Sequence, residues 1–183
     1  QRLSVLRELE KNMDGYQNSV RAVMRAAGAR RLRGVLGPVS TILKVEPGCE
    51  VAIETALGGA LQNIVVENEA AAKAAIALLR NDHAGRATFL PLDTVQPGVF
   101  RGRLSGTARL ASALVQADPR YENIVSNLLG RIIVVEDINE ASRVARDNGY
   151  HNKVVTMDGQ VINAGGSFTG GSVQRSAGLF TRK

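Results

Sequence analysis

Apolar residues cluster in two segments that share one pattern, a short continuous run followed by helical spacing. Residues 64–66 and 133–135 both read Ile-Val-Val, and each run is followed by a glutamate. A continuous β-branched run is typical of a buried strand. After each glutamate, apolar residues return at intervals of three and four, which predicts a helix. A second apolar run then follows, at 87–90 and at 153–156, and predicts another strand.

The two segments therefore predict a strand–helix–strand unit that occurs twice. Residues 64–75 align with residues 133–144 at an offset of 69, and a Leu-Gly step precedes each, at 57–58 and 129–130. A solenoid needs at least three repeats, whereas two copies suit two related lobes. The expected fold class is α+β, a mixed α/β fold with two similar lobes.

Turn residues and helix-start residues predict the remaining elements. Helices are expected over about 47–57 and about 119–129, because each range begins with a proline. Residues 154–162 predict a hairpin that turns at Asp158-Gly159 as a type I′ turn. Glycine, proline and arginine are frequent in 93–109, which predicts an irregular connection between the lobes.

The first helix of the chain has two interpretations. Its apolar residues recur at alternating intervals of three and four, which is the a/d pattern of a coiled coil. The pattern covers about two and a half heptads, fewer than the three or four typical of a coiled coil, and Gly15 interrupts it. It fits either a coiled-coil end or an amphipathic helix packed on the domain. The residues of the pattern are Leu6, Leu9, Met13, Tyr16, Val20 and Val23.

Composition indicates a globular chain. Its 183 residues are 44% hydrophobic, which suits one domain or two small lobes that share a core. No apolar run approaches the roughly 20 residues of a membrane span, and no signal peptide is recognisable, so no membrane contact is expected. Cys49 is the single cysteine, which leaves no internal disulfide and favours a cytoplasmic location.

Residues that could perform chemistry are scattered. His83 and His151 have no partner at ligand spacing, and the acidic residues form no clear acid–base pair. No serine lies in a nucleophile-elbow motif. Aromatic residues make up 4% of the chain and tryptophan is absent, which argues against a base-stacking platform. We expect no enzymatic activity, no metal, no cofactor and no small-molecule substrate.

Positive charge is concentrated at the two ends of the chain. Residues 1–33 hold eight basic and three acidic side chains, and residues 172–183 hold three basic and no acidic ones. The middle, 34–171, carries a net charge of −2 within a total of +6. The ends form either one surface that binds a polyanion, if the fold brings them together, or two solvated tails.

The run from Ala164 to Ser172 holds two glycine pairs on either side of Ser-Phe-Thr. Gly165 and Gly170 have the spacing of a phosphate-binding P-loop, and Ser172 occupies its hydroxyl position. The lysine that this motif needs is replaced by Gly171, and a hairpin precedes the run. Three interpretations remain: a nucleotide-binding loop, a flexible loop, and a surface that another backbone approaches closely.

Seven short motifs follow one another in a recognisable order. They are GY at 15–16, GVLGPV at 34–39, AIETALG at 52–58, QNIVV at 62–66, GRATFLPL at 85–92, TMDGQV at 156–161 and GGSFTGGS at 165–172. In this order the chain resembles the hinge domain of structural maintenance of chromosomes (SMC) proteins, most closely the bacterial ones. The resemblance covers nearly the whole chain.

The resemblance implies a two-lobed hinge, at the end of an antiparallel coiled coil, that joins a second hinge as a ring-shaped homodimer with two contact surfaces. The implied function is the dimerisation of a chromosome-organising SMC ATPase in chromosome condensation and segregation, with a nucleoid-associated location. ATPase heads are expected only in the full-length protein. The implied boundaries are a coiled-coil end and entry helix at 1–25 and a hinge at 26–183, in which lobe one is about 34–95, the connection about 96–110, lobe two about 111–172 and the exit 173–183.

The resemblance also assigns the glycine run to the dimer contact, where a β-carbon would hold apart two backbones that must meet. The expected interface residues are Gly165, Gly166, Phe168, Thr169, Gly170 and Gly171. The alternative functions are a nucleotide-binding regulatory domain that uses 165–172, and a structural docking domain with no role in nucleic-acid binding.

In this family the two ends of the hinge meet where the coiled coil leaves it, so we expect one DNA-binding surface there. Binding should be weak, independent of sequence and strongly salt-dependent. Some bacterial relatives carry lysines just after the glycine motif, where this chain has Gln-Arg-Ser at 174–176, so the C-terminal half of this surface is expected to be weaker. The expected DNA-binding residues are Arg21, Arg25, Arg30, Arg31, Arg33, Arg175, Arg182 and Lys183.

Overall fold

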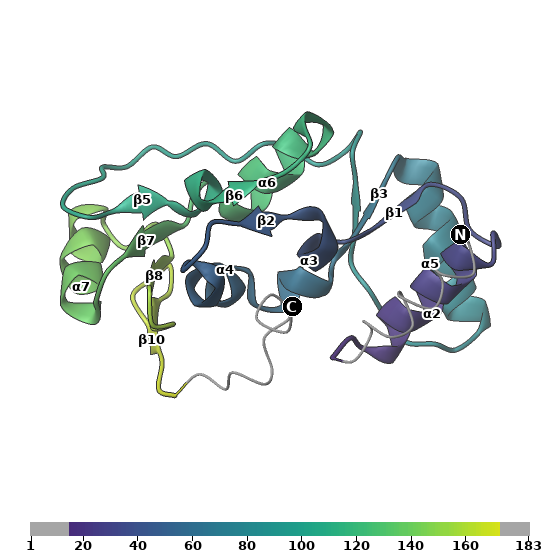
Figure 1. Ribbon diagram of the computed structural model, residues 1–183, viewed down its shortest axis with the longest axis horizontal. Helices are drawn as coiled ribbons and strands as arrows, with labels where there is room; N and C mark the ends of the chain where they lie inside the picture. The colour runs from purple at the N-terminus through teal and green to yellow at the C-terminus, as the bar shows by residue number, and fades with distance from the viewer. Residues whose placement is uncertain (1–14, 173–183) are drawn as a thin grey trace. The chain divides into compact units, whose positions relative to one another are not determined.

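A computed structural model describes residues 15–172 of the chain (Figure 1). These residues form two compact units. Unit 1 consists of 15–42 and 61–95, and unit 2 consists of 43–60 and 96–172. These bounds differ from the lobes expected from the sequence, because residues 43–60 pack in unit 2 rather than in lobe one.

Unit 1 packs two helices on a three-stranded sheet of order β1-β3-β4. The central strand β3 is antiparallel to β1 and parallel to β4. Ile64 and Val66 of β3 are fully buried against Val23 and Ala75 of the two helices. The elements are α2 (Asn18–Gly28), β1 (Val35–Pro38), α3 (Val39–Ile42), β3 (Ile64–Val66), α5 (Glu69–Asn81) and β4 (Phe89–Pro91).

Unit 2 contains a five-stranded sheet of order β10-β9-β8-β7-β5 and a two-stranded sheet of β2 and β6. Ile133 of β7, Val154 of β8 and Ile162 of β9 are fully buried in its core with Ala141 and Ala145 of α7. The elements are β2 (Lys44–Val45), α4 (Glu50–Leu57), β5 (Arg109–Leu110), η2 (Ala111–Leu114), β6 (Val115–Gln116), η3 (Pro119–Tyr121), α6 (Glu122–Leu129), β7 (Ile133–Val135), α7 (Ile138–Asp147), β8 (Val154–Thr156), β9 (Val161–Ile162) and β10 (Phe168–Thr169); the short η1 (Gly58–Gln62) links α4 to β3.

The predicted strand–helix–strand repeat is confirmed. β3-α5-β4 and β7-α7-β8 are both parallel pairs joined by a helix. Asn68 caps α5 by accepting a hydrogen bond from the Ala71 N–H, and Asp137 caps α7 by accepting one from the Glu140 N–H. The two caps lie 69 residues apart, the offset found in the sequence. The mixed α/β fold class is therefore confirmed as well.

The repeat extends further upstream than the sequence pattern predicts. β1, α3, β2 and α4 precede β3 in the same order in which β5, η2, β6 and α6 precede β7. The equivalent strands β2 and β6 pair with each other, with Lys44 opposite Gln116 and Val45 opposite Val115. The pairing of β2 with β6 places α4 in unit 2, where α4 packs on α6 and β8. Lys153 of unit 2 donates a 2.9 Å hydrogen bond to the Ala56 carbonyl at the end of α4.

Two local predictions needed correction. The helix expected from residue 47 begins three residues later, at Glu50, after a turn in which the Cys49 N–H donates to the Glu46 carbonyl at 3.0 Å. The hairpin between β8 and β9 forms, but its turn is not type I′, because only Gly159 has a positive φ (89°) and Asp158 does not. The loop is one residue longer than a two-residue I′ turn allows, so a turn closed by the Gly159 N–H and the Thr156 carbonyl is followed by Gly159 in the left-handed region.

The described part of the N-terminal segment is an amphipathic helix packed on unit 1. Val20 and Val23 of α2 are buried in the unit 1 core beside α5. Gly15 has a φ of 98°, and α2 begins only at Asn18, so Tyr16 lies before the helix. Leu6, Leu9 and Met13, and with them the coiled-coil interpretation, lie outside the described residues.

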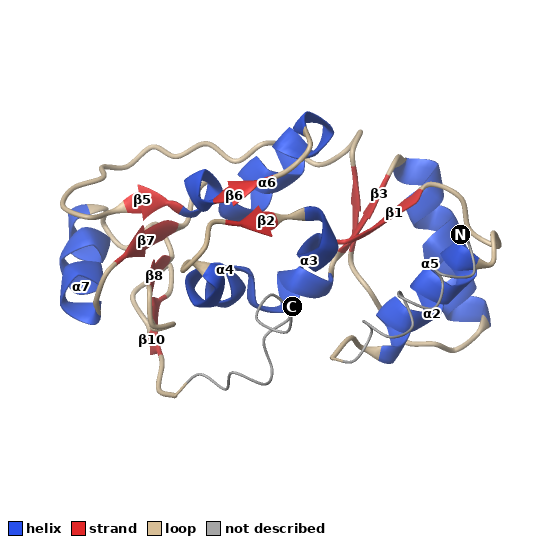
Figure 2. Cartoon of the chain, in the orientation of Figure 1, coloured by secondary structure: helices blue, strands red, loops and turns tan. Residues whose placement is uncertain are grey.

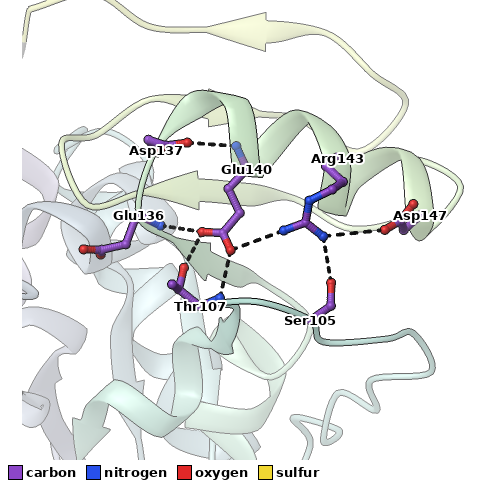
Figure 3. Close-up of polar contacts among 7 residues, drawn as sticks. All are labelled: Ser105, Thr107, Glu136, Asp137, Glu140, Arg143 and Asp147. Atoms are coloured by element: carbon purple, nitrogen blue, oxygen red, sulfur yellow. Dashed lines mark hydrogen bonds and ion pairs between the residues drawn. The ribbon is translucent and has the colours of Figure 1, made fainter.

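The connection between β4 and β5, residues 92–108, contains no helix or strand (Figure 2). Side-chain bonds to α7 hold its second half. Glu140 accepts hydrogen bonds from the N–H of Thr107, at 2.8 Å, and from its hydroxyl, and Arg143 donates to the Ser105 hydroxyl at 3.0 Å (Figure 3). The pKa of Glu140 is lowered mainly by the Thr107 hydroxyl, which favours the carboxylate.

Candidate dimer interface and nucleic-acid surface

The centre of the glycine run, β10 (Phe168–Thr169), forms the edge strand of the five-stranded sheet. β10 pairs with β9 in antiparallel register, Phe168 opposite Ile162 and Thr169 opposite Val161. No further strand of the described chain follows β10 in this sheet (Figure 1). The Phe168 side chain is 59% exposed, which is unusual for a large apolar residue in a strand. β10 therefore presents an open edge that carries an exposed aromatic ring.

The backbone groups of this edge alternate between β9 and solvent. The Asn163 N–H donates to the Ser167 carbonyl at 2.7 Å, so the backbone groups of Ser167 and Thr169 point toward β9. By strand alternation, Phe168 and Gly170 direct their N–H and C=O groups to the open edge. Such unpaired groups are a template for another strand.

Side chains from the preceding hairpin fix the position of this edge. Gln160 forms two hydrogen bonds with the Gly171 backbone: its Oε1 accepts from the N–H at 2.8 Å, and its Nε2 donates to the carbonyl at 3.1 Å. Asn163 Nδ2 donates to the Thr169 hydroxyl at 3.1 Å. At the other end of the run, the Gly165 N–H donates to the Tyr150 carbonyl at 2.7 Å. The segment is therefore a turn at 164–166 followed by the short strand β10, both held by hydrogen bonds, which does not fit a flexible loop.

Two of the glycines have a backbone conformation that favours glycine, and each lies against open space. Gly165 and Gly171 have φ values of 93° and 132°, and a β-carbon on either would meet no atom of the described chain within 4 Å. Packing inside the chain therefore does not explain the absence of side chains there. The chain instead offers bare backbone toward solvent, which fits close approach by another backbone.

Unit 1 has a second open edge, at β4. The Ile64 N–H donates to the Thr88 carbonyl and the Leu92 N–H donates to the Val66 carbonyl, so the backbone groups of residues 88, 90 and 92 point toward β3. The backbone groups of Phe89 and Pro91 consequently point away from β3, toward the open edge of the sheet. In the repeat, β4 is the counterpart of β8, whose corresponding edge pairs with β9.

The described arginines of the predicted DNA surface lie on α2 and the loop after it. Arg25, Arg30, Arg31 and Arg33 are exposed; we call them the α2 basic surface. Arg31 pairs with Asp82 at 3.6 Å, an exposed contact of little energetic weight. Arg21 differs from the others, because it is partly buried and its Nε has no hydrogen-bond partner among the described residues.

A helix-terminal motif sets the direction of this loop. Arg30 has a φ of 62°, its N–H donates to the Ala27 carbonyl at 3.1 Å, and the Arg31 N–H donates to the Ala26 carbonyl at 2.8 Å. This is the Schellman arrangement, in which glycine usually holds the position of Arg30. The loop and the first turn of α5 line a hollow of about 430 Å³ that also contains Glu67.

The structure brings only part of the predicted surface together. Arg25, Arg30, Arg31 and Arg33 belong to one continuous segment of unit 1. Arg175, Arg182 and Lys183 lie outside the described residues.

Burial shifts the pKa values of three further groups within residues 15–172. Burial raises the pKa of the Cys49 thiol, with a further contribution from Glu46, and this keeps the thiol protonated. Burial also raises the pKa of Tyr16, whose hydroxyl bonds to Ser40, and lowers the pKa of Lys153. Within residues 15–172, no three His, Cys, Asp or Glu side chains are grouped to hold a metal ion. No helix in that range is long and apolar enough to cross a membrane.

A family model described as the flexible hinge domain of SMC proteins matches residues 32–145. The chain belongs to the SMC hinge family. The chromosome partition protein Smc of Desulfitobacterium hafniense is 39% identical over 181 residues, and that of Bacillus subtilis is 36% identical over 178 residues. These matches cover 95% and 93% of the chain. The hinge chain spans only 15% of the length of either relative.

Solved structures agree with this assignment. The asymmetric dimer of the Geobacillus stearothermophilus SMC hinge domain matches with a TM-score of 0.85 and 36% identity, over all of this chain and 76% of that one. The Pyrococcus furiosus SMC hinge domain matches with a TM-score of 0.73 and 28% identity, over 89% of this chain and 84% of that one. The expected SMC hinge fold is confirmed.

Sequence reasoning missed the residues that hold the candidate interface in place. Gln160 and Asn163 act through side-chain bonds to the glycine run, up to 11 positions away in the sequence. No periodicity marks such amides. The only available signal was their place between a turn and the glycine motif.

Proposed function

We propose that this hinge joins a second copy of itself, with β10 of each chain beside β4 of the other. The observation that carries the proposal is the open β10 edge, with Phe168 exposed and glycines on both sides of it. The closely similar Geobacillus stearothermophilus hinge forms an asymmetric dimer, which supports self-association. The expected interface residues, Gly165, Gly166, Phe168, Thr169, Gly170 and Gly171, all belong to this edge.

The strand β4 is the proposed acceptor because its edge is also open and because the internal repeat supplies a precedent. In unit 2, the counterpart of β4 is extended by β9 and β10. In unit 1 no described strand extends β4, so the edge of a second chain can complete the sheet. A two-fold axis then creates this contact twice. The two contacts close a ring and pair both open edges, β4 and β10, of each chain.

Cross-linking between introduced cysteines tests this pairing. Thr88 and Thr169 are exposed at β4 and β10, whereas the native Cys49 is only 2% exposed. We expect a mixture of T88C and T169C chains to give a covalent dimer with a short bismaleimide, and each variant alone to give none. The unsubstituted chain controls for Cys49. Efficient cross-linking of T169C with itself would show that β10 pairs with β10 and would overturn the assignment to β4.

The second part of the proposal is sequence-independent DNA binding by the α2 basic surface, joined by Arg21, Arg175, Arg182 and Lys183. Arg30, Arg31 and Arg33 are exposed on one short loop. Of the three, only Arg31 forms an ion pair within the described residues, with the exposed Asp82. Three or four neutralised phosphates give a slope of log K against log salt of roughly −3. We expect R30Q/R31Q/R33Q to weaken binding of duplex DNA and flatten this slope. The control K44Q/R120Q/R146Q removes the same charge from exposed positions of unit 2 and should leave both nearly unchanged; equal losses would reject a defined surface.

The full-length protein is proposed to be a chromosome-organising SMC ATPase acting in chromosome condensation and segregation at the nucleoid, in the cytoplasm. The hinge itself is proposed to be non-enzymatic, with residues 1–25 as the coiled-coil end and 26–183 as the hinge. The alternative of a nucleotide-binding loop at 165–172 is less well supported, because Phe168 and Thr169 form a strand instead of wrapping a phosphate. Heat released on adding ATP would favour that alternative.

A further inference from the structure

Unit 2 contains a basic hollow that neither the proposed dimer contact nor the α2 basic surface uses. Its volume is about 530 Å³. Three arginines, Arg101, Arg103 and Arg131, line it together with His151, and the only acidic side chain in its lining is Asp147. All three arginines are exposed. We call this site the unit 2 hollow.

The backbone that carries these arginines is held by buried and partly buried amide side chains. Asn148 is only 9% exposed; its Oδ1 accepts from the Arg103 N–H at 2.7 Å, and its Nδ2 donates to the Arg103 carbonyl at 3.0 Å. Asn152 Nδ2 donates to the Arg131 carbonyl at 2.8 Å. Both asparagines belong to the turn after α7. The irregular connection and Arg131, which precedes β7, are therefore both fixed to one turn, and residues of these three segments line the hollow.

The charge of the unit 2 hollow is not neutralised within the described chain. Arg101, Arg103 and Arg131 form no ion pair with another residue of 15–172. Asp147 lies 3.9 Å from Arg143, an arginine of α7 outside the lining, so its charge is shared with a further cation. Three arginines and one partly compensated carboxylate thus line a space of about 530 Å³, which is large enough for several oxygen atoms.

We propose that the unit 2 hollow binds phosphate groups of a DNA backbone, as a second contact separate from the α2 basic surface. Guanidinium groups are planar, permanently charged and able to donate two parallel hydrogen bonds to a phosphate. Phosphate contacts position a nucleic acid without reading its sequence, which matches the absence of tryptophan and the low aromatic content. The fixed backbone lowers the ordering cost of binding.

Fluorescence anisotropy of a labelled 30-base-pair duplex, titrated with the chain at several salt concentrations, tests the proposal. The variant R101Q/R103Q/R131Q removes three positive charges, and K44Q/R120Q/R146Q removes the same number from outside both basic sites. We expect the hollow variant to bind about tenfold more weakly at low salt and to have a slope shallower by roughly 2–3 units, at about 0.9 per phosphate contact. Equal behaviour of the hollow variant and its control would overturn the proposal.

Two further arms separate this proposal from the others. The variant R30Q/R31Q/R33Q should keep the DNA binding that depends on the hollow. Combining these substitutions with R101Q/R103Q/R131Q should abolish most of the remaining binding. If R30Q/R31Q/R33Q alone removes all binding, the hollow is not a DNA contact. Inorganic pyrophosphate should compete with the duplex only at millimolar concentrations; tight pyrophosphate binding would assign the hollow to a free polyphosphate instead. Because Asn148 holds only the backbone of Arg103, these substitutions should preserve the fold, and R101Q/R103Q, which spares Arg131, provides a milder variant whose melting temperature confirms this.

Discussion

The side-chain amide of Gln160 pairs with the backbone of Gly171 as a neighbouring strand would, accepting from its N–H at 2.8 Å and donating to its carbonyl at 3.1 Å. This pairing extends the contact between the two strands to Gly171, two residues beyond the last paired strand residue, Thr169. The glycine run is thereby kept extended where it has no side chains of its own to pack. Its open edge is ordered before any partner arrives, which lowers the entropic cost of association.

Loss of the Gln160 amide should therefore weaken dimerisation more than folding. In Q160A the two exposed hydrogen bonds to Gly171 disappear, each contributing about 0.5–1.5 kcal/mol, together with a longer one to the Asp158 carbonyl at 3.4 Å. We expect the dimer dissociation constant to rise about tenfold, measured by sedimentation equilibrium, with a small change in melting temperature. Q116A is the control, because Gln116 is also exposed on a strand of unit 2 but lies away from the glycine run. Equal effects of both substitutions would contradict this role.

Gly165 allows backbone strain to be separated from interface contact. Gly165 and Gly48 have nearly the same φ, 93° and 89°, and both have open space where a β-carbon would project. Alanine at either position should lower the free energy of unfolding by about 1–3 kcal/mol through strain alone. Only G165A should also raise the dimer dissociation constant, by tenfold or more. A dimer equally strong in G165A and G48A would place the contact elsewhere.

Arg30 combines a strained backbone with a proposed phosphate contact. Its φ of 62° is unfavourable for a side chain with a β-carbon, and glycine is the usual residue at this position of the helix end. We expect R30G to raise the free energy of unfolding by about 0.5–1 kcal/mol in a urea titration, after allowing for the greater entropy of glycine in the unfolded chain. The same variant should bind duplex DNA more weakly. A stabilised variant with unchanged affinity would remove Arg30 from the DNA surface.

Lys153 gives the stability of the chain a specific pH dependence. Its ammonium group donates to the Ala56 carbonyl at 2.9 Å, yet burial lowers its pKa below the usual 10.5. The unfolded chain therefore binds more protons than the folded chain between the lowered pKa and 10.5, so this group adds stability as the pH rises through that range. We expect the unfolding free energy of the wild type, relative to K153M, to increase over this interval.

The control for Lys153 is K73M, because the exposed Lys73 has a raised pKa and titrates in the opposite sense. The wild type should lose stability relative to K73M as the pH rises above 10.5. A flat difference between wild type and K153M would show that the Lys153 ammonium is not destabilised by burial.

The repeated strand–helix–strand units could be predicted because each rests on a local pattern. Ile-Val-Val at 64–66 and 133–135 buries completely, and each helix begins at a side-chain cap within the same segment. Local patterns of this kind can be recognised in a single sequence. The pairing of β2 with β6 could not be predicted, because Lys44 and Val45 form a strand of only two residues whose partner lies about 70 positions away.

The candidate site shows the same division. The glycine motif identified the run at 165–172, but its conformation as an edge strand depends on Gln160, Asn163 and Tyr150, which reach it by tertiary contacts. The dipeptide Asp158-Gly159 alone predicts a type I′ turn, but the length of the loop decides the turn type. The basic hollow of unit 2 could not be predicted from the sequence, because Arg101 and Arg131 are 30 positions apart and are brought together only by the turn after α7.

The most direct test of the central claim is the solution mass of the chain and of its F168E variant, measured by light scattering at the same concentration. Phe168 is 59% exposed, so the substitution should leave the fold intact while placing a charge at the centre of the proposed contact. We expect the wild type at twice the chain mass of 19.5 kDa and the folded variant at 19.5 kDa. A monomeric wild type, or a variant that remains fully dimeric, would contradict self-association through the β10 edge.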